Sequence, residues 1–297
     1  MKRRAFTKLA TLSAVAVSTS GFLRFNGKTF EGDCETTTDI LGPFYRPDSP
    51  VRNNLVIESE PGDLVELSGV VRHKDCSTLY QGAKVELWHC SSDEVYDNDS
   101  DEFRYRGTTF CDAEGRYSFT TQMPVPYDAG GGRYRPAHFH LLISAPNYQS
   151  LITQIYFTGD PYLEKDSSSA SPKASGRILK VQESEGMKKV VFDINMNDKL
   201  MASTAAIAKI VGRYVQKPGG GQTFVFFEKN RALWMENEVY GLKFDYIGNN
   251  TFSVPGLPTG SSVLFHFDLK KEGEIQLTLN QTMEDGVKHK SVFIKIA

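Results

Sequence analysis

Short β-type segments recur along the first two thirds of the chain, and their spacing constrains the fold more than any other feature. Each segment is apolar or alternates apolar with polar residues, and turn residues such as Gly82, Asp112 and Gly115 separate neighbours. The segments are 65–71, 83–88, 117–120, 138–144, 151–157 and 189–194. Short strands joined by polar connections are typical of a β-sandwich. We therefore predict a sandwich domain over residues 23–196, with a Ser-rich surface loop at 166–176.

The composition changes near residue 197. Residues 200–210 are rich in Ala and predict a short helix within a linker at 197–211. Residues 212–297 contain further short β-type segments, which are 223–227, 262–267 and 291–294. Their pattern resembles the small lipocalin-like β domain appended to many serine β-lactamase-like hydrolases. The predicted fold class is mainly β, with a β-sandwich catalytic domain and a small all-β, lipocalin-like accessory domain after it.

The N-terminus has the pattern of an export signal. Residues 1–4 are basic, residues 9–17 are apolar, and small residues follow at 18–21. The apolar stretch is too short to span a bilayer, so residues 1–22 are predicted to be a signal peptide and no membrane span is expected. The residues from Arg3 to Lys8 also resemble a twin-arginine signal. A periplasmic or secreted protein is therefore predicted.

Charge and cysteine content exclude some partners and indicate others. The net charge of the 297 residues is −2, which gives no reason to expect nucleic acid as a partner. The four cysteines fit an oxidising compartment, where they allow two disulfides in three pairings. Cys76 and Cys90 flank one candidate hairpin, so that pair is favoured, and Cys34 with Cys111 follows by elimination. No C-x-x-C motif occurs, which argues against a cysteine zinc site.

Two histidines share one predicted strand. His138 and His140 lie at the start of an apolar run, and alternate residues of a strand point to the same face, at most ~7 Å apart. The pair therefore supplies half of a metal site. Tyr96 and Tyr127 lie upstream, and Arg135 is adjacent to the pair.

The types of these residues indicate which metal they would hold. Deprotonating a tyrosine, whose ordinary pKa is about 10, is repaid best by a hard trivalent ion. Two tyrosinates and a hydroxide would neutralise Fe(III), which avoids a buried net charge. Zinc and copper sites draw on other ligand sets. The cupin pattern requires a Glu three or four residues after the histidine pair, and residues 141–145 contain none.

Several motifs occur in a fixed order and resemble a known family. They are Gly-Pro-Phe-Tyr at 42–45, Gly-Ala-x-Val-x-x-Trp at 82–88, Gly-x-Tyr-x-Phe at 115–119, Pro-Tyr at 126–127, RPAHFH at 135–140 and LITQIYFTGDP at 151–161. Together they resemble the intradiol ring-cleavage dioxygenases, the group that contains protocatechuate 3,4-dioxygenase and catechol 1,2-dioxygenase. The resemblance covers roughly residues 38–194.

The resemblance implies one non-haem Fe(III) per catalytic domain, a catechol-type small molecule and O2 as substrates, and muconate-type diacids as products. It implies a ligand set and a group of substrate-side residues. The metal ligands would be Tyr96, Tyr127, His138 and His140, and the substrate-side residues would be Tyr45, Arg135 and Gln154. Tyr127 would also take a proton from the substrate, and Arg135 would stabilise negative charge on its ring. These two residues and Gln154 are the predicted catalytic residues.

The short segment before residue 42 cannot contain the helical dimerisation segment of catechol 1,2-dioxygenases, which favours the protocatechuate type. A homo-oligomer is compatible with the sequence.

Two other classes of protein share parts of this pattern. A prealbumin-like binding module would have the same β-segments but no reason to contain two tyrosines with a histidine pair. A zinc hydrolase that used His138 and His140 would need a carboxylate or a third histidine as a further ligand. The remaining histidines, His73, His89, His266 and His289, are predicted to be structural or solvated.

Overall fold

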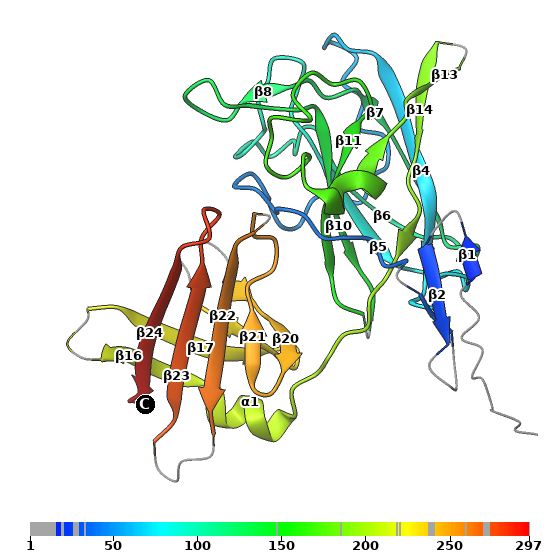
Figure 1. The fold of residues 1–297 in the computed structure, drawn as a ribbon. Helices are drawn as coiled ribbons and strands as arrows, with labels where there is room; N and C mark the ends of the chain where they lie inside the picture. Colours follow the sequence, from blue (N-terminus) through cyan, green and yellow to red (C-terminus); the bar gives the residue numbers. More distant parts are fainter. Residues whose placement is uncertain are drawn as a thin grey trace, which may run out of the picture.

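Two β-rich units follow one another along the chain in the computed structural model of this protein (Figure 1). The structure describes residues 16–18, 21–25, 30–32 and 34–296, except 147, 185, 218, 220, 237–240, 259 and 270–273. Each unit has its own cluster of buried apolar side chains. Strands predominate in both units, which confirms the predicted mainly β fold class.

Three short strands near the N-terminus pair with one another in a small antiparallel sheet. They are β1 (Ala16–Ser18), β2 (Gly21–Phe25) and β3 (Phe30–Gly32). The predicted signal peptide, residues 1–22, lies outside the described residues apart from 16–18 and 21–22. The signal peptide therefore stays a prediction.

The first unit is a sandwich of two five-stranded sheets, as the spacing of the β-segments predicts. One sheet has the order β12-β11-β10-β5-β6, and the other has the order β13-β14-β4-β15 with β7 paired to β4. The strands of the first sheet are β5 (Lys84–Trp88), β6 (Arg106–Phe110), β10 (His138–Ser144), β11 (Leu151–Phe157) and β12 (Ile178–Leu179). Those of the second are β4 (Leu64–Arg72), β7 (Arg116–Gln122), β13 (Gln182–Ser184), β14 (Met187–Val191) and β15 (Ile194–Asn195). A separate hairpin of β8 (Tyr127–Asp128) and β9 (Tyr134–Arg135), and a 3-10 helix, η1 (Pro172–Arg177), complete the unit.

Strand β10 separates the sandwich core from the candidate site. Phe139, Leu141 and Ile143 are fully buried in the core cluster between the sheets. Because side chains alternate along a strand, His138 and His140 point to the opposite face of the same sheet. Burial of each core side chain contributes about 1.5–3 kcal/mol, so the register of β10 is strongly fixed. The core thereby fixes the direction of both imidazoles.

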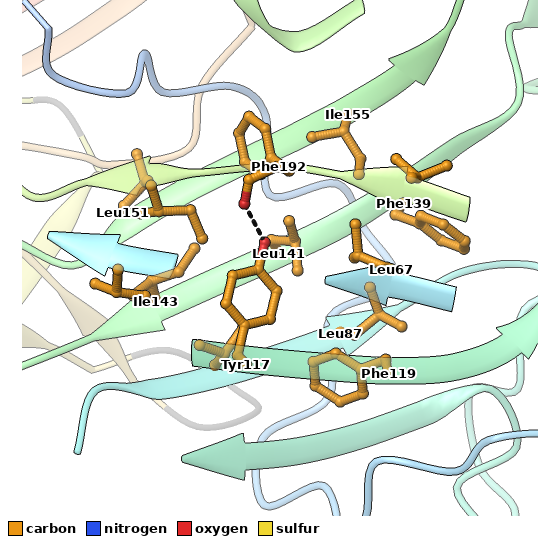
Figure 2. Close-up of a cluster of buried hydrophobic side chains, with 14 of the residues drawn as sticks. Leu67, Leu87, Tyr117, Phe119, Phe139, Leu141, Ile143, Leu151, Ile155 and Phe192 are labelled. Atoms are coloured by element: carbon orange, nitrogen blue, oxygen red, sulfur yellow. Dashed lines mark hydrogen bonds between the residues drawn. The ribbon is translucent and has the colours of Figure 1, made fainter. Parts of the chain in front are cut away.

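The second sheet packs closely around Phe192, which lies between β14 and β15. The hydroxyl of Tyr117 on β7 donates to the carbonyl oxygen of Phe192 at 2.7 Å, the bond drawn in Figure 2. A Cβ added to Gly69 would lie 2.0 Å from that same carbonyl oxygen. Glycine is therefore required on β4 at this position, because any side chain would push the backbone around Phe192 away.

The second unit begins with a helix that is shorter than predicted. The helix α1 (Thr204–Ile210) starts after Ser203, whose side chain accepts a hydrogen bond from the backbone N–H of Ala206 at 3.1 Å. This N-cap sets the start of the helix at residue 204, whereas the Ala-rich composition predicts residue 200. Within the described part of the chain, no helix is long and apolar enough to cross a lipid bilayer.

Nine antiparallel strands follow the helix and form one curved sheet. They are β16 (Gly212–Lys217), β17 (Thr223–Lys229), β18 (Ala232–Met235), β19 (Leu242–Lys243), β20 (Asp245–Gly248), β21 (Thr251–Ser253), β22 (Ser262–Asp268), β23 (Gln276–Thr282) and β24 (Lys288–Lys295). The edge strands β19 and β20 are separated in sequence only by Phe244, so the two edges of the sheet meet there. Strands that pair within the sheet are also consecutive in the sequence, with one exception: β16 pairs with β24. The result is a nearly closed up-and-down barrel, the architecture that a lipocalin-like domain requires.

The predicted cysteine pairing is wrong. The structure contains a disulfide between Cys34 and Cys76, while Cys90 and Cys111 are free and buried. The prediction placed Cys76 and Cys90 at the two ends of one hairpin, but β4 and β5 belong to different sheets and do not pair. Cys34 instead lies next to β15, where the side chain of Asn195 donates to the carbonyl oxygen of Cys34 at 2.8 Å. Strand β15 pairs with the end of β4, the strand that precedes Cys76.

Candidate metal centre

The histidine pair on β10 lies among aromatic and polar side chains of the two neighbouring strands. In the antiparallel register, His138 is opposite Tyr156 on β11, and His140 is opposite both Gln154 on β11 and Trp88 on β5. The indole of Trp88 stacks on the imidazole of His140, with ring centroids 4.8 Å apart. All five side chains are almost fully buried. The sheet therefore presents the imidazoles on a rigid, dry surface.

The two imidazoles point their Nε2 atoms toward one another. The distance between Nε2 of His138 and Nε2 of His140 is 3.2 Å. Nδ1 of His138 lies 2.6 Å from the carbonyl oxygen of Pro136, and because a carbonyl oxygen can only accept, the proton of this imidazole is on Nδ1. Nε2 of His138 is consequently a free lone pair aimed at the space between the rings, which is the arrangement of a metal-binding histidine.

The structure brings both predicted tyrosines to the same space. The phenol oxygen of Tyr96 lies 3.3 Å from Nε2 of His138. Tyr96 comes from the long connection between β5 and β6, and its ring stacks on Phe44 at a centroid distance of 4.4 Å. Tyr127 on β8 has its ring 5.5 Å from that of Tyr96 and 5.6 Å from that of His138. Side chains from three separate parts of the chain thus converge with four potential donor atoms.

Burial keeps all four groups uncharged in the metal-free protein. Burial lowers the pKa of His138 to about 3, and it lowers the pKa of His140 well below the usual value. Burial likewise raises the pKa of Tyr96 well above the usual value. Burial also raises the pKa of Tyr127, against which the neighbouring Arg135 acts in the opposite direction. Two neutral imidazoles and two protonated phenols are therefore present at neutral pH.

This donor set fits a hard trivalent cation. No group of three or more His, Cys, Asp or Glu side chains that could hold a metal ion occurs among the described residues, so a zinc site of the usual kind is not formed there. The pair His138 and His140 is completed instead by phenols, which lose their protons only to a strongly acidic metal ion. Ferric iron fits these residues, because two tyrosinates would offset most of its charge in a buried site.

Arg135 and Gln154, two of the predicted substrate-side residues, lie beside the four donors. Nη2 of Arg135 donates to Oε1 of Gln154 at 2.8 Å. The amide nitrogen of Gln154 donates to the carbonyl oxygen of Ile40 at 2.8 Å and also lies 3.2 Å from Nδ1 of His140. Burial alone would lower the pKa of Arg135, but Tyr156 and Asp166 outweigh burial and hold this pKa above its usual value. A fixed positive charge therefore lies next to the site.

The prediction of a surface loop at 166–176 is wrong for its first residues. Nε of Arg135 donates to Oδ2 of Asp166 at 3.0 Å, and Ser168 and Ser169 are only 2 % exposed. The other oxygen of Asp166 accepts from the backbone N–H groups of both serines. A Ser-rich composition is typical of exposed loops, but here the loop folds inward around a carboxylate that compensates a buried cation.

Three further buried residues, which the sequence did not indicate, extend this network. The hydroxyl of Tyr156 donates to Oδ2 of Asp39 at 2.8 Å, and Arg177 pairs with the same oxygen. Nη1 of Arg177 also donates to the backbone carbonyl of Gln154 at 2.8 Å. The opposite charges of Asp39 and Arg177 are the signal that could have indicated an ion pair. Because the two residues lie far apart in the sequence, their pairing could not be predicted from it.

Tyr45 and Gly42, the two ends of the Gly-Pro-Phe-Tyr motif, border the site from another direction. The ring of Tyr45 lies 5.1 Å from that of Trp88. Gly42 has φ +75°, and a Cβ at this position would lie 3.1 Å from Cε1 of His140. The Gly-Pro-Phe-Tyr motif therefore passes close to His140, and this contact together with the positive φ requires glycine at residue 42.

The other histidines have structural contacts or are exposed. His89 is buried, with Nδ1 2.7 Å from the carbonyl oxygen of Cys90 and Nε2 2.8 Å from the hydroxyl of Thr121. His73 contacts the hydroxyl of Tyr148, His266 contacts Thr251 at 2.9 Å, and His289 is exposed. These contacts agree with the structural or solvated role predicted for them.

Comparison with known proteins indicates the family to which this chain belongs. The sequence profile of the dioxygenase family matches residues 40–198, more than half of the chain. Catechol 1,2-dioxygenase of Candida albicans is 40% identical over 153 residues, which are 44% of this chain and 50% of that protein. Chlorocatechol 1,2-dioxygenase of Rhodococcus opacus is 34% identical over 158 residues, which are 46% of this chain and 61% of that protein. The chain thus spans about half to three fifths of the length of these two relatives.

A solved structure agrees with the fold of the first unit. The crystal structure of wild-type catechol 1,2-dioxygenase from Acinetobacter radioresistens superposes with a TM-score of 0.50 at 26% identity, covering 56% of this chain and 63% of that one. The sandwich, the convergent residues and the profile match lead to one class: the chain belongs to the intradiol ring-cleavage dioxygenase family of dioxygenases. The profile match ends at residue 198, before the barrel of the second unit begins.

Proposed function

We propose that the first unit is a non-haem Fe(III) dioxygenase that cleaves catechol-type aromatics between the two hydroxyl-bearing carbons. The observation that carries this proposal is the convergence on Nε2 of His138, which lies 3.2 Å from Nε2 of His140 and 3.3 Å from the phenol oxygen of Tyr96. The reaction balances with one O2 for each ring, because the bond between the two oxygenated carbons breaks and each carbon gains one oxygen atom. The product of catechol is then cis,cis-muconic acid.

Tyr96, Tyr127, His138 and His140 would hold one ferric ion in this unit. The ion, when bound, supplies the Lewis acidity that favours loss of the catechol protons and reaction of the ring with O2. Trp88 and Phe44 stack on two of the four side chains, on His140 and Tyr96. This packing leaves the donors little freedom to rotate, which favours a preorganised site.

Tyr127 and Arg135 would carry out the proton transfer and the charge stabilisation of this reaction. The guanidinium of Arg135 lies beside Tyr127 and opposes the rise in the phenol pKa that burial causes. Tyr127 can therefore exchange a proton at its phenolic oxygen more readily than burial alone would permit. Arg135 itself stays protonated and can stabilise negative charge on the substrate ring, the role that a fixed cation performs best in a dry site.

Gln154 and Tyr45 would position the substrate ring. Gln154 is held from both ends, since its oxygen accepts from Arg135 and its nitrogen donates to Ile40. Tyr45 is half-buried and packs on Trp88, so its side chain lies at the border of the dry cluster. A catechol bound at this border would have Gln154 and Arg135 on one side and the Gly-Pro-Phe-Tyr motif on another.

Iron content and colour test this proposal. The purified full-length protein should contain one ferric ion per chain and show the red-purple absorption of iron bound to tyrosinate. Anaerobic addition of catechol should shift this absorption, and admission of air should restore it as O2 is consumed. A colourless protein that binds Zn²⁺ stoichiometrically and consumes no O2 with catechol would contradict the proposal.

Export is a further part of the proposal. Its support is the basic and apolar N-terminal sequence, together with a disulfide between Cys34 and Cys76. Both fit a periplasmic or secreted enzyme that acts on aromatics outside the cytoplasm. Cell fractionation tests this part, and recovery of the full-length chain with intact N-terminus in the cytoplasm would contradict it. Assembly into a homo-oligomer and a protocatechuate-type substrate stay predictions.

A further inference from the structure

Three consecutive residues, Ile40, Leu41 and Gly42, form what we call the 40–42 segment, and each contacts the candidate site. The carbonyl oxygen of Ile40 accepts from the amide of Gln154 at 2.8 Å. The side chain of Leu41 packs against the buried cluster that includes Tyr96 and Tyr127. The α-carbon of Gly42 passes so close to His140 that a Cβ would lie 3.1 Å from its ring. The segment therefore forms one wall of the site.

The opposite side of this wall contacts the second unit. The backbone N–H of Leu41 donates to the carbonyl oxygen of Gly256, in the β21–β22 connection (residues 254–261), at 3.0 Å. In Figure 1 the blue trace of residues near 40 runs between this orange connection and the green strands of the first unit. The second unit thus supplies the hydrogen-bond partner of a backbone N–H in this wall.

The approach of the two units at this point is close enough to require glycine. Gly256 has φ +70°, and a Cβ there would lie 2.8 Å from Cβ of Leu41 and 3.2 Å from Cδ1 of Ile152 on β11. A second link holds the units nearby, where the amide of Gln149 donates to Oδ2 of Asp245 at 3.0 Å. The backbone nitrogen of Leu41 also lies 3.1 Å from the added Cβ. The two units are therefore in close contact here, and a shift of a few tenths of an ångström on one side must move the other.

We propose that Gly256, in the β21–β22 connection of the barrel, is a specificity-determining residue of the dioxygenase site. By fixing Leu41, it sets the size of the apolar ring substituent that a catechol can carry. Leu41 contributes an apolar side chain to this wall, so the discrimination is by size and not by charge. The proposal rests on the proposed function, because it concerns the substrates of the same site. It assigns a role in substrate selection to the barrel.

A pair of glycine variants isolates this contact. Gly256→Ala adds a Cβ against Leu41, whereas Gly260→Ala in the same connection adds one whose nearest atom, the carbonyl oxygen of Glu284, is 3.7 Å away. Both glycines have positive φ, +70° and +88°, so both variants carry a similar backbone strain. Any difference between them therefore reports the contacts of residue 256 with Leu41 and Ile152.

Two measurements on the full-length, iron-loaded variants test the proposal. Hydrogen exchange of the Leu41 N–H should be about fivefold faster in Gly256→Ala than in Gly260→Ala, the change expected for losing one backbone hydrogen bond. The ratio of KM for 4-methylcatechol to KM for catechol should rise about threefold in Gly256→Ala, because Leu41 is pushed into the site. The kcat for catechol should stay within about twofold, and Gly260→Ala should match the wild type in all three quantities.

The outcomes separate this proposal from the proposed function. A wild-type protein that turns over neither catechol nor 4-methylcatechol contradicts the proposed function and this proposal with it. A wild-type protein that turns over both, with equal exchange rates and KM ratios in the two variants, contradicts this proposal alone. Should Gly256→Ala fail to fold, Asp245→Ala removes the second link instead. Faster Leu41 exchange in Asp245→Ala than in Gly260→Ala would support the proposal, and equal exchange would overturn it.

Discussion

Nε of Arg135 lies 3.0 Å from Oδ2 of Asp166, and the two side chains are only 10 % and 8 % exposed. This buried ion pair orients a cation that also donates to Gln154 at 2.8 Å. Burial alone would raise the pKa of Asp166, but Arg135 outweighs burial and holds it below the usual value. The carboxylate thus stays charged at neutral pH and positions the guanidinium toward the four donor residues.

Asp166→Asn should therefore impair turnover without removing the metal. Loss of the charge partner lets Arg135 rotate, and a misplacement of about 1 Å lowers kcat by about 10- to 100-fold. The tyrosinate-to-iron absorption should be retained, since Asp166 is not among the four proposed ligands. Glu164→Gln, at an exposed residue two positions before Asp166, is the matched control. Equal loss of kcat in both variants would show that Asp166 does not position Arg135.

Arg135→Leu removes the cation itself. The expected result is a coloured protein whose kcat with catechol is about 10²- to 10³-fold lower, the usual cost of removing one preorganised group that stabilises charge. Steady-state oxygen uptake measures this change. Arg133→Leu removes an exposed arginine of the same hairpin and should leave kcat unaltered. An unchanged kcat in Arg135→Leu would exclude the predicted electrostatic role.

Tyr96→Phe tests the assignment of the first ligand. Because the phenol oxygen of Tyr96 faces Nε2 of His138 at 3.3 Å, its loss should change the energy and lower the intensity of the tyrosinate-to-iron band. Tyr105→Phe serves as the control, since Tyr105 is equally buried but its hydroxyl donates to Glu60 at 2.5 Å instead. If the visible spectrum of Tyr96→Phe is that of the wild type, the first tyrosine ligand lies elsewhere.

His89 makes the stability of the fold depend on pH. Burial lowers its pKa to about 4 from an ordinary value of 6.5, so between these values the unfolded chain binds more protons than the folded one. The free energy of unfolding should therefore fall as the pH decreases from 6.5 to 4, by about 3 kcal/mol from this group. Urea unfolding at several pH values should give a shallower dependence for His89→Gln than for His289→Gln. An equal pH dependence of the free energy of unfolding in the two variants would contradict the assignment of this effect to His89.

The disulfide between Cys34 and Cys76 should contribute measurably to stability. It closes a loop with a sequence separation of 42, for which a contribution of about 2–4 kcal/mol is expected. The double variant Cys34→Ser, Cys76→Ser should lower the free energy of unfolding by that amount. Peptide mapping without reduction should recover Cys34 linked to Cys76. A peptide that links Cys76 to Cys90 would contradict the pairing and restore the one predicted from sequence.

The part of the site on β10 could be predicted from the sequence because it depends on local periodicity. His138 and His140 alternate with Phe139 and Leu141, and the core side chains fix which face the histidines occupy. Tyr96 has no such pattern around it. It lies in an irregular connection where Glu94 adopts positive φ, so only the family resemblance indicated its position.

The features that the sequence did not reveal depend on long-range packing. Asp166 lies in a Ser-rich stretch typical of a surface loop, and only its ion pair with Arg135 explains why it is buried. The cysteine pairing depends on which sheet each strand joins, and β4 and β5 join different sheets. The contact of Gly256 with Leu41 joins residues of two separately packed units, for which the sequence contains no local signal.

Labelled oxygen provides the most direct test of the central claim. The purified protein would be supplied with catechol under ¹⁸O2, and the product would be analysed by mass spectrometry. The account predicts cis,cis-muconic acid with two labelled oxygen atoms, one in each carboxyl group. Cleavage of a ring bond next to the two hydroxyl-bearing carbons, and not between them, would contradict the account. A product without label or unreacted catechol would also contradict it.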